Sequence, residues 1–415
     1  MTDSKRRKGL TVASALLGGV LVLTGCSGGG DASAADGGES SQAKADEAAA
    51  AKSSEAAITI TPKDGSNNAS INNSATVKVA KGELTDVHMT TSDGHDIEGA
   101  LAADKLSWKP NAQLERSTTY KISAEAKDSK GRVAHENASF TTVAPANSFI
   151  GNFTPDNGST VGVGMPVSIN FDKAITNKSA VQKGITVSSS SGQEVVGHWF
   201  GANRIDFRPE TYWKENSTVT LKLALDGVEG ASGVYGVQQK TITFHIGRNQ
   251  VSYVDAATKQ MKITHNGQVI KQIPISAGSP ENKTYAGIMV MSEKFKQTRM
   301  NGATVGFTDD DGKGEYDIKD VPHAIRLTSS GTFLHGNYWG AKSIFGSVNT
   351  SHGCVGLSDT KGANDPNTPA AWMFNNSLVG DVVVIKNTGD RTVSPDNGLN
   401  GWNMDWAQWK AGSAA

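Results

Sequence analysis

The most informative stretch of the chain runs from His335 to Leu357 and reads HGNYWGAKSIFGSVNTSHGCVGL. It contains Cys354, one of only 2 cysteines among the 415 residues; the other, Cys26, ends an apolar N-terminal segment. Cys354 therefore has no expected disulfide partner, and a cysteine left over in an exported protein indicates a reactive thiol or an intermolecular bridge. His352 and His335 precede Cys354 in this stretch. The two histidines favour the reactive thiol.

The first 26 residues have the pattern of an export signal. The basic run Lys5–Lys8 precedes the apolar stretch Leu10–Leu23, which is short for a membrane-spanning helix. The segment ends in Leu23-Thr24-Gly25-Cys26, which resembles a lipobox, the site at which bacterial lipoproteins are diacylated on the cysteine sulfur and cut just before it. We expect residues 1–26 to be a lipoprotein signal peptide and Cys26 to carry the lipid anchor. An ordinary signal peptide and an uncut anchor are the alternatives, and both would export the rest of the chain.

Residues 27–55 consist largely of Gly, Ser, Ala, Asp and Glu. Such a segment cannot bury enough apolar surface to order itself, so it predicts a flexible tether. We expect the folded part to stand in the cell wall, at the outer face of the cytoplasmic membrane. The 40 basic and 41 acidic side chains give a net charge of −1, which argues against a nucleic-acid partner.

Two segments of similar plan follow, residues 56–145 and 146–247. Both contain short β-branched runs separated by Gly, Asn, Asp and Ser, at the spacing of antiparallel sandwiches. Thr154–Gly158 echoes Thr61–Gly65, and Phe207-Arg208-Pro209 echoes the tripeptide that begins at Trp108. A repeat of about a hundred residues indicates domain duplication, because solenoid repeats are shorter. We predict two tandem immunoglobulin-like modules without an internal disulfide.

Aromatic and histidine side chains in these modules have a structural interpretation. Trp108 and Trp199 could stack on a ligand, but we expect them in the cores, because large aromatics supply much of a sandwich's burial. Four histidines stand among polar neighbours, and we expect them at the surface: His88, His95, His135 and His198.

A third domain is expected over residues 248–390. Asn266-Gly267 separates two apolar runs and predicts a tight hairpin, because both residues tolerate positive φ. The expected strands are 251–254, 260–264, 269–275, 288–291, 324–327, 333–334 and 382–385. One helix is suggested at Ala370–Asn376. The whole protein is thus predicted to be mainly β.

The chemistry of a thiol beside a histidine can be argued from the residues. A free cysteine is only partly ionised at neutral pH, and a histidine within hydrogen-bond reach can remove its proton. Residues two apart in an extended segment point to the same side, so His352 and Cys354 can face one cavity. Gly353 between them permits a tight turn that exposes amide N–H groups to a developing oxyanion.

Ser351-His352-Gly353-Cys354, with His335-Gly336 before it and Gly380-Asp381-Val382-Val383-Val384 after it, resembles the active-site signature of the L,D-transpeptidases with a YkuD-type catalytic fold. The order of parts also resembles the mycobacterial-type members, so the resemblance covers nearly the whole chain beyond the tether. It implies that Cys354 is the nucleophile, that His352 is the general base and that the Ser351 carbonyl orients His352.

The resemblance also implies the residues around this triad. The oxyanion site would use the Gly353 and Cys354 amides and the Tyr316 hydroxyl. The expected substrate-binding residues are Tyr316, His335, Gly336, Asn337, Trp339 and Met300. Met300 would belong to a mobile flap, and four glycines would let that flap move: Gly302, Gly306, Gly312 and Gly314.

One position departs from the family pattern. After Ser-His-Gly-Cys and one apolar residue the family usually carries Asn or Arg, and this chain has Gly356. The departure removes a polar side chain from the expected pocket floor. It keeps open a second interpretation, in which the site is degenerate and the protein is a non-catalytic lipoprotein that binds or scaffolds the cell wall.

Two further alternatives concern Cys354 itself. It could be a buried small hydrophobic residue, or it could bind zinc together with His352 and His335. No carboxylate or fourth ligand is suggested nearby, so we expect no metal and no cofactor.

Residues 391–415 form a tryptophan-rich tail. Leu399, Trp402, Trp406 and Trp409 are spaced to share one face of a helix. The stripe could face glycan or membrane; we expect it to pack against the catalytic domain as a helical brace, as in the resembling proteins.

The expected function follows from the resemblance. Cys354 attacks the third residue of a peptidoglycan tetrapeptide stem, expels the terminal D-Ala and passes the acyl group to the amine of a neighbouring stem, which forms a 3→3 cross-link. With water as acceptor the enzyme would be an L,D-carboxypeptidase. The resemblance also implies acylation by carbapenem β-lactams.

Overall fold

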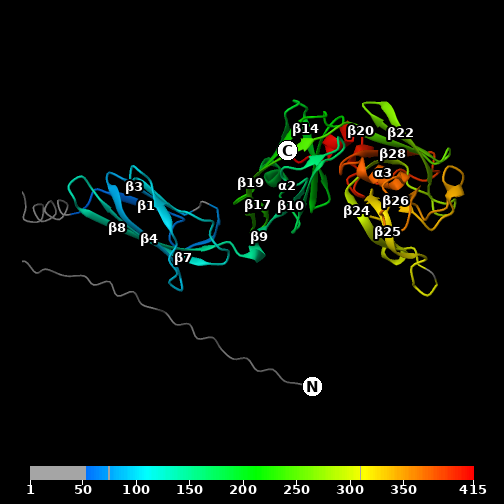
Figure 1. Cartoon of the computed structure of the whole chain (residues 1–415). Helices are drawn as coiled ribbons and strands as arrows, with labels where there is room; N and C mark the ends of the chain where they lie inside the picture. Colours follow the sequence, from blue (N-terminus) through cyan, green and yellow to red (C-terminus); the bar gives the residue numbers. More distant parts are fainter. Residues whose placement is uncertain (1–52, 73–74, 309) are drawn as a thin grey trace, which may run out of the picture. The chain divides into compact units, whose positions relative to one another are not determined.

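The computed structural model describes residues 53–72, 75–308 and 310–415 (Figure 1). The expected signal peptide, Cys26 and almost the entire expected tether lie outside the described residues. No helix in the described part of the chain combines the length and the apolar character needed to cross a membrane.

The first sandwich consists of two four-stranded sheets, ordered β1-β3-β6-β5 and β2-β8-β7-β4. Its strands are β1 (Ala57–Thr61), β2 (Ser66–Ala69), β3 (Thr76–Ala80), β4 (Glu83–Thr91), β5 (Gly99–Leu101), β6 (Ser107–Pro110), β7 (Thr119–Lys127) and β8 (Val133–Thr142). Buried and exposed residues alternate along β7, as expected of a strand with one face on the core. Trp108 is buried in this core, which confirms its structural interpretation.

The second sandwich repeats this plan with sheets ordered β10-β12-β15-β14 and β11-β19-β16-β13, and adds a small sheet, β17-β18-β9. Its strands are β9 (Ser148–Phe149), β10 (Gly151–Thr154), β11 (Thr160–Val161), β12 (Val167–Phe171), β13 (Ile185–Ser189), β14 (Val195–Phe200), β15 (Arg204–Pro209), β16 (Thr218–Ala224), β17 (Glu229–Ala231), β18 (Val234–Gly236) and β19 (Gln239–Ile246). Short helical elements are η1 (Pro145–Asn147) and α2 (Lys178–Lys183). The Asn177 side chain caps α2 by accepting a hydrogen bond from the Ala180 N–H.

The strand register supports the duplication seen in the sequence. Val77 on β3 pairs with Trp108 on β6, and Val167 on β12 pairs with Phe207 on β15. The two tripeptides that echo each other in the sequence therefore occupy equivalent positions in their sandwiches.

The third domain is built on a nine-stranded sheet, ordered β23-β28-β20-β21-β22-β27-β26-β25-β24. Its strands are β20 (Gln250–Asp255), β21 (Gln260–His265), β22 (Gln268–Ser276), β23 (Gly287–Val290), β24 (Glu293–Asn301), β25 (Asp317–Arg326), β26 (Phe333–Asn337), β27 (Val355–Ser358) and β28 (Val382–Lys386). The helical elements are η2 (Gly302–Val305), η3 (Lys342–Ile344) and α3 (Pro369–Asn375). The Asn-Gly hairpin is confirmed, because Asn266 and Gly267 have φ values of 49° and 79° between β21 and β22.

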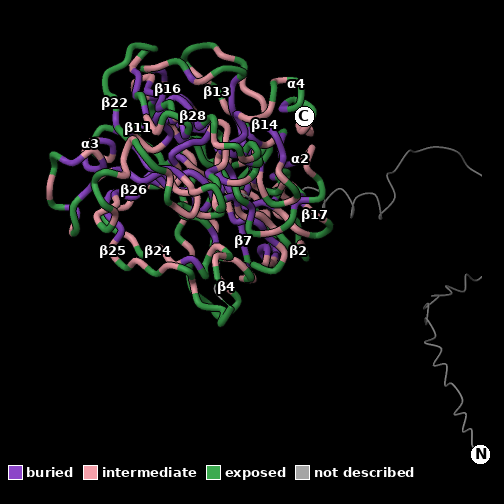
Figure 2. Tube along the Cα trace, turned by 90° about the vertical axis from the view of Figure 1, so that its right-hand side faces the viewer, coloured by how far each residue is buried: buried purple, intermediate pink, exposed green. Residues whose placement is uncertain are grey.

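The second sandwich and the nine-stranded domain share one hydrophobic core. Val161 and Val163 pack in the same cluster as Val251 and Val382. The Gly162 N–H donates to Val379 O at 2.8 Å. Figure 2 shows buried residues gathered in the interior and exposed residues in the peripheral loops.

One histidine in the second sandwich contradicts the surface prediction. His88, His95 and His135 are exposed, but His198 is buried. Its ring stacks on Trp409 with 4.8 Å between ring centroids, and its Nδ1 lies 2.8 Å from Trp409 O. The prediction was wrong for His198 because its cover comes from the tail, which lies far away in the sequence.

The tail is a brace, but its helix is not continuous. It forms η4 (Gly401–Asn403) and the short helix α4 (Trp406–Ala411), which begins at an Asp405 cap with extended backbone. Trp402 and Trp409 are buried, and their indole N–H groups donate to Gly164 O at 2.7 Å and Val196 O at 2.9 Å. The expected single helical face is therefore wrong, because the capping box at Asp405 starts a new helix.

The tail contacts the second sandwich as well as the third domain. The buried Arg208 guanidinium lies over the rings of Trp402 and Trp409, at 4.6 and 4.3 Å from their centroids. Asn403 exchanges hydrogen bonds with the backbone of Ile288 on β23.

Candidate active site

Two parallel strands in the nine-stranded sheet bring the predicted residues together. β26 and β27 pair in parallel, with His335 opposite Gly356 and Leu334 opposite Val355. Cys354 directly precedes β27, so the thiol and the His335 ring come from neighbouring strands. Val355 and Leu357 are buried, which anchors β27 in the core.

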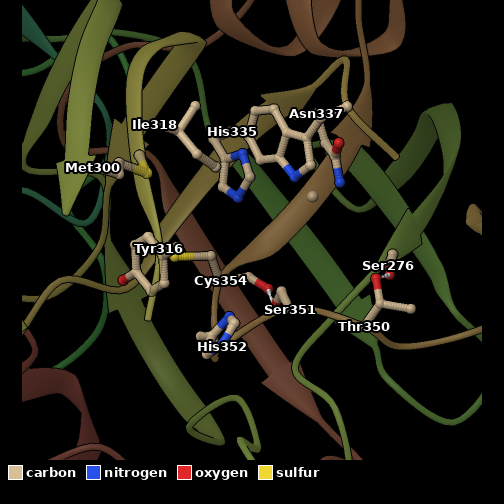
Figure 3. Close-up of a pocket in the computed structure, with 12 residues that line it drawn as sticks. Ser276, Met300, Tyr316, Ile318, His335, Asn337, Thr350, Ser351, His352 and Cys354 are labelled. Carbon is tan, nitrogen blue, oxygen red and sulfur yellow. Dashed lines mark hydrogen bonds between the residues drawn. The ribbon is translucent and has the colours of Figure 1, made fainter. Parts of the chain in front are cut away.

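Cys354 opens into a cavity of about 170 Å³ (Figure 3). The cavity is lined by Ser276, Met300, Tyr316, Ile318, His335, Asn337, Trp339, Thr350, Ser351, His352, Cys354 and Gly356. Every predicted site residue from the folded part lines it except Gly336 and Gly353. Ser276, Thr350 and Ile318 also line the cavity but were not predicted, because no local motif marks them.

The Cys354 thiol is partly enclosed. Its sulfur lies 3.5 Å from Gly331 O, and in Figure 3 it is directed toward Tyr316. Burial raises the pKa of Cys354 to about 11. The resting group is therefore a neutral thiol at pH 7, and it needs a base at the moment of attack.

His335 is held in the orientation of a base. Its Nδ1 lies 2.9 Å from Gly336 O, and because a carbonyl can only accept, Nδ1 carries the proton. In the neutral ring Nε2 then has a free lone pair. Burial lowers the pKa of His335, with the Gly336 hydrogen bond and the Asp359 charge opposing this shift. The Trp339 ring stacks on the imidazole at 5.6 Å between centroids.

His352 lines the same cavity as Cys354, but its hydrogen-bond partner is not that of the predicted triad. Its Nε2 lies 3.1 Å from Glu315 Oε2. The Ser351 carbonyl instead accepts the Ser279 N–H at 2.8 Å, within a bridge between Gly278 and Ser351. Among the hydrogen bonds of the described residues, the expected one between His352 and Ser351 O is absent, so this orienting role of Ser351 was wrong.

Ser351 acts through its hydroxyl. Ser351 Oγ donates to Cys354 O at 2.5 Å and accepts the Gly353 N–H at 3.2 Å. The Gly353 amide, expected in the oxyanion site, is thus already engaged. Gly353 has a φ of 111°, so it provides the predicted turn without lining the cavity.

The Tyr316 ring lies beside the Cys354 thiol, and in Figure 3 its hydroxyl oxygen is on the side of the ring away from the sulfur. Burial raises the pKa of Tyr316 to about 12, and the neighbouring Cys354 and Glu315 act in the same direction. A phenol with this pKa keeps its proton at neutral pH and can donate it in a hydrogen bond.

A buried polar network lies behind His335. The Asp359 carboxylate accepts hydrogen bonds from the Thr360 N–H at 2.7 Å and the Thr368 hydroxyl at 2.8 Å, and it pairs with His323 Nδ1 at 2.8 Å. A Cβ at Gly336 would lie only 2.0 Å from Asp359 Oδ2. Asp359 therefore packs against the residue whose carbonyl orients His335.

The absence of a side chain at Gly356 leaves a space in the cavity beside the Asn337 side-chain amide. A Cβ at Gly356 would make ordinary contacts, at 3.4 Å from Ser276 O and 3.7 Å from Asn337 Nδ2. Asn337 Oδ1 accepts the Gly340 N–H at 2.8 Å, which assigns the amide orientation and leaves Nδ2 toward the cavity. The departure at position 356 therefore does not strip the pocket floor of polar groups.

The expected flap is the loop between β24 and β25, which we define as residues 302–316. Met300 is the second-last residue of β24 and lines the cavity. Gly306 and Gly312 have positive φ values of 86° and 75°. Gly302 and Gly314 are needed for close packing instead, since a Cβ at Gly314 would lie 2.3 Å from Asn301 Oδ1. Motion of the flap stays a prediction.

Metal ligation was the alternative for the same residues. In the described part of the chain, no group of three or more His, Cys, Asp or Glu side chains is gathered in a way that could hold a metal ion.

Comparison with known proteins gives consistent matches. The L,D-transpeptidase catalytic domain (YkuD) matches residues 249–385, and a bacterial Ig domain matches residues 66–229. L,D-transpeptidase 2 of Mycobacterium tuberculosis is 30% identical over 357 residues, which cover 86% of this chain and 85% of that protein. L,D-transpeptidase 5 of the same species is 28% identical over 365 residues, covering 86% and 77%.

A solved structure of an LD transpeptidase in complex with imipenem is 27% identical, with a TM-score of 0.47, and the match covers 58% of this chain and 100% of that chain. The relative that shares 30% identity over most of both lengths, together with the match to the catalytic domain, shows the family: the chain belongs to the L,D-transpeptidases.

Proposed function

We propose that this L,D-transpeptidase forms 3→3 cross-links in peptidoglycan through a thioester on Cys354, with His335 as the general base. The observation that carries the proposal is the His335 hydrogen bond to Gly336 O, which leaves Nε2 unprotonated in the same cavity as the thiol. His352 is the weaker candidate, because its Nε2 is engaged by Glu315.

The acylation step follows from this arrangement. His335 Nε2 takes the thiol proton while Cys354 Sγ attacks the carbonyl of the third stem residue. The negative charge on the carbonyl oxygen is stabilised by the Cys354 N–H and the Tyr316 hydroxyl. His335 then gives its proton to the leaving amine, and D-Ala departs as the thioester forms.

Deacylation uses the same groups in reverse. The side-chain amine of a neighbouring stem attacks the thioester, and His335 removes the proton that the new amide must lose. The thiol is regenerated when this proton returns to sulfur. With water as the nucleophile the product is the tripeptide, which is the carboxypeptidase outcome.

Mass spectrometry of muropeptides tests this function. A purified disaccharide tetrapeptide incubated with the wild-type protein should yield D-Ala and a 3→3 dimer, and Cys354→Ala should yield neither. A tripeptide without dimer would assign water as the acceptor. Identical products from both proteins would support the scaffold interpretation and contradict the acyl transfer.

We also propose that the protein is exported and anchored by a lipid on Cys26; the lipobox-like sequence supports this. In the native host, partition of the wild type into the detergent phase and of Cys26→Ala into the aqueous phase is expected. Equal partition of the two proteins would contradict the anchor.

A further inference from the structure

Three side chains of the flap contact one residue of the Ser-His-Gly-Cys segment. Glu315 Oε2 lies 3.1 Å from His352 Nε2, the Tyr316 ring centroid lies 5.0 Å from that of His352, and the Phe307 ring meets it edge-on at 5.6 Å. His352 is thus the point at which the flap touches the segment that carries Cys354.

Glu315 and Tyr316 are neighbours with different tasks. Glu315 contacts His352 through its carboxylate, and Tyr316 lines the cavity beside the thiol. The Glu315 N–H donates to Phe307 O at 3.0 Å, and the Gly302 N–H donates to Tyr316 O at 2.9 Å. These backbone hydrogen bonds join the two sides of the flap. A contact that fixes Glu315 therefore also restricts the position of Tyr316.

A second ion pair joins the two strands at the base of the flap. Arg299 donates two hydrogen bonds to the Asp317 carboxylate, at 2.7 and 2.8 Å, where β24 meets β25. One polar attachment of the flap to the rest of the site is the contact between Glu315 and His352. Both of these side chains are partly exposed, at 41% and 36% of their surface, so the attachment can open and close without a large desolvation cost.

We propose that Glu315 is a positioning residue that latches the flap onto His352 and thereby holds the Tyr316 side chain beside Cys354. His352 is the receiving half of the latch. The inference rests on the proposed acyl transfer to Cys354, because Tyr316 matters there as a donor to the oxyanion.

Loss of the contact between Glu315 and His352 should change the rate of acylation and the rate of alkylation of Cys354 in opposite directions. Acylation by meropenem needs Tyr316 in place, so it should slow when the flap opens. Alkylation of Cys354 by iodoacetamide needs only access to the thiol, so it should become faster. A surface ion pair without a positioning role would change neither rate.

The test compares Glu315→Ala, Glu315→Gln and the wild type, with Asp310→Asn as the matched control for an exposed carboxylate of the same flap. Glu315→Ala should lower the meropenem acylation rate about fivefold and raise the iodoacetamide rate at least about twofold, as a shift in flap population predicts. Glu315→Gln keeps an oxygen that can accept from His352 Nε2–H, so it should recover more than half of the loss. Asp310→Asn should match the wild type.

Each other result overturns the latch. Both rates of Glu315→Ala unchanged would show a surface pair without consequence, and both rates reduced together would show an electrostatic effect on the thiol. Because Glu315 is exposed, the variants should fold, and equal melting temperatures check this. A wild-type protein that meropenem does not acylate would contradict the proposed function itself, which is a separate outcome.

Discussion

The two walls of the active-site cavity differ in how they hold their functional groups. His335 is buried, its proton is fixed by Gly336 O, and the buried Asp359 backs that glycine. Tyr316 and Glu315 lie on a flap attached through a partly exposed contact to His352. From this difference we predict that the fold holds the His335 base in a fixed position, whereas Tyr316, the proposed oxyanion donor, moves with the flap.

The largest difference between the two sides of the cavity is expected when each histidine is replaced in turn. His335→Gln should lower the acylation rate by roughly 10²–10⁴, the usual contribution of a general base. His352→Gln should lower it by no more than about tenfold, because only the latch is lost. Stopped-flow measurement of meropenem acylation gives both rates. A larger loss for His352→Gln would reverse the assignment of the base.

Substitution of Gly336 tests whether the His335 side of the cavity positions the base. Gly336→Ala forces its Cβ against Asp359 Oδ2 and should displace the carbonyl that orients His335, with a loss of roughly 10- to 100-fold in acylation. Gly356→Ala, on the paired strand, has room for its methyl group and should cost less than about threefold. Equal rates for the two variants would show that Asp359 and Gly336 do not position the base.

The pH dependence distinguishes the thiol from its base. Because burial raises the pKa of Cys354 to about 11, the thiolate fraction grows about tenfold per pH unit up to that value. Iodoacetamide alkylation should therefore still be rising at pH 10. Burial lowers the pKa of His335, so the base is already neutral at pH 7 and meropenem acylation should stay nearly flat from pH 7 to 9. An alkylation plateau near pH 9 would contradict the raised thiol pKa.

A smaller effect is expected at the pocket floor. Asn337→Ala removes the Nδ2 donor that faces the space above Gly356 and should raise KM for the tetrapeptide about threefold to tenfold with little change in kcat. Steady-state kinetics separate the two constants. A fall in kcat alone would place Asn337 in the transition state instead.

The tail should affect stability and leave the chemistry unchanged. Trp409→Ala removes a fully buried side chain and should lower the free energy of unfolding by about 3–5 kcal/mol. The melting temperature reports this, and the acylation rate well below it should match the wild type within about twofold. An unchanged melting curve would contradict the brace.

The features that could be predicted from the sequence are those that depend on a short local pattern. The Asn266-Gly267 hairpin, α3 and the core positions of Trp108 and Trp199 depend on turn chemistry, capping and residue size. Cys354, His352 and His335 could also be predicted, because the Ser-His-Gly-Cys run and the second histidine stand in one stretch of sequence, whereas Ser276, Ile318 and Thr350 could not.

The roles of the two histidines could not be predicted from spacing. Two-residue spacing shows that His352 and Cys354 can share a side, but the pairing of β26 with β27 and the reach of Glu315 are long-range contacts. The same limit explains His198, which is covered by a tail far away in the sequence. It also explains Asp359, whose link to His335 exists only once the sheet has formed.

The most direct test of the central claim is peptide-level mass spectrometry of the wild-type protein after incubation with meropenem. One covalent adduct with the mass of the drug is expected, carried by the peptide that contains Cys354 and absent from Cys354→Ala. A folded wild-type protein without an adduct, or with the adduct on another residue, would contradict the claim.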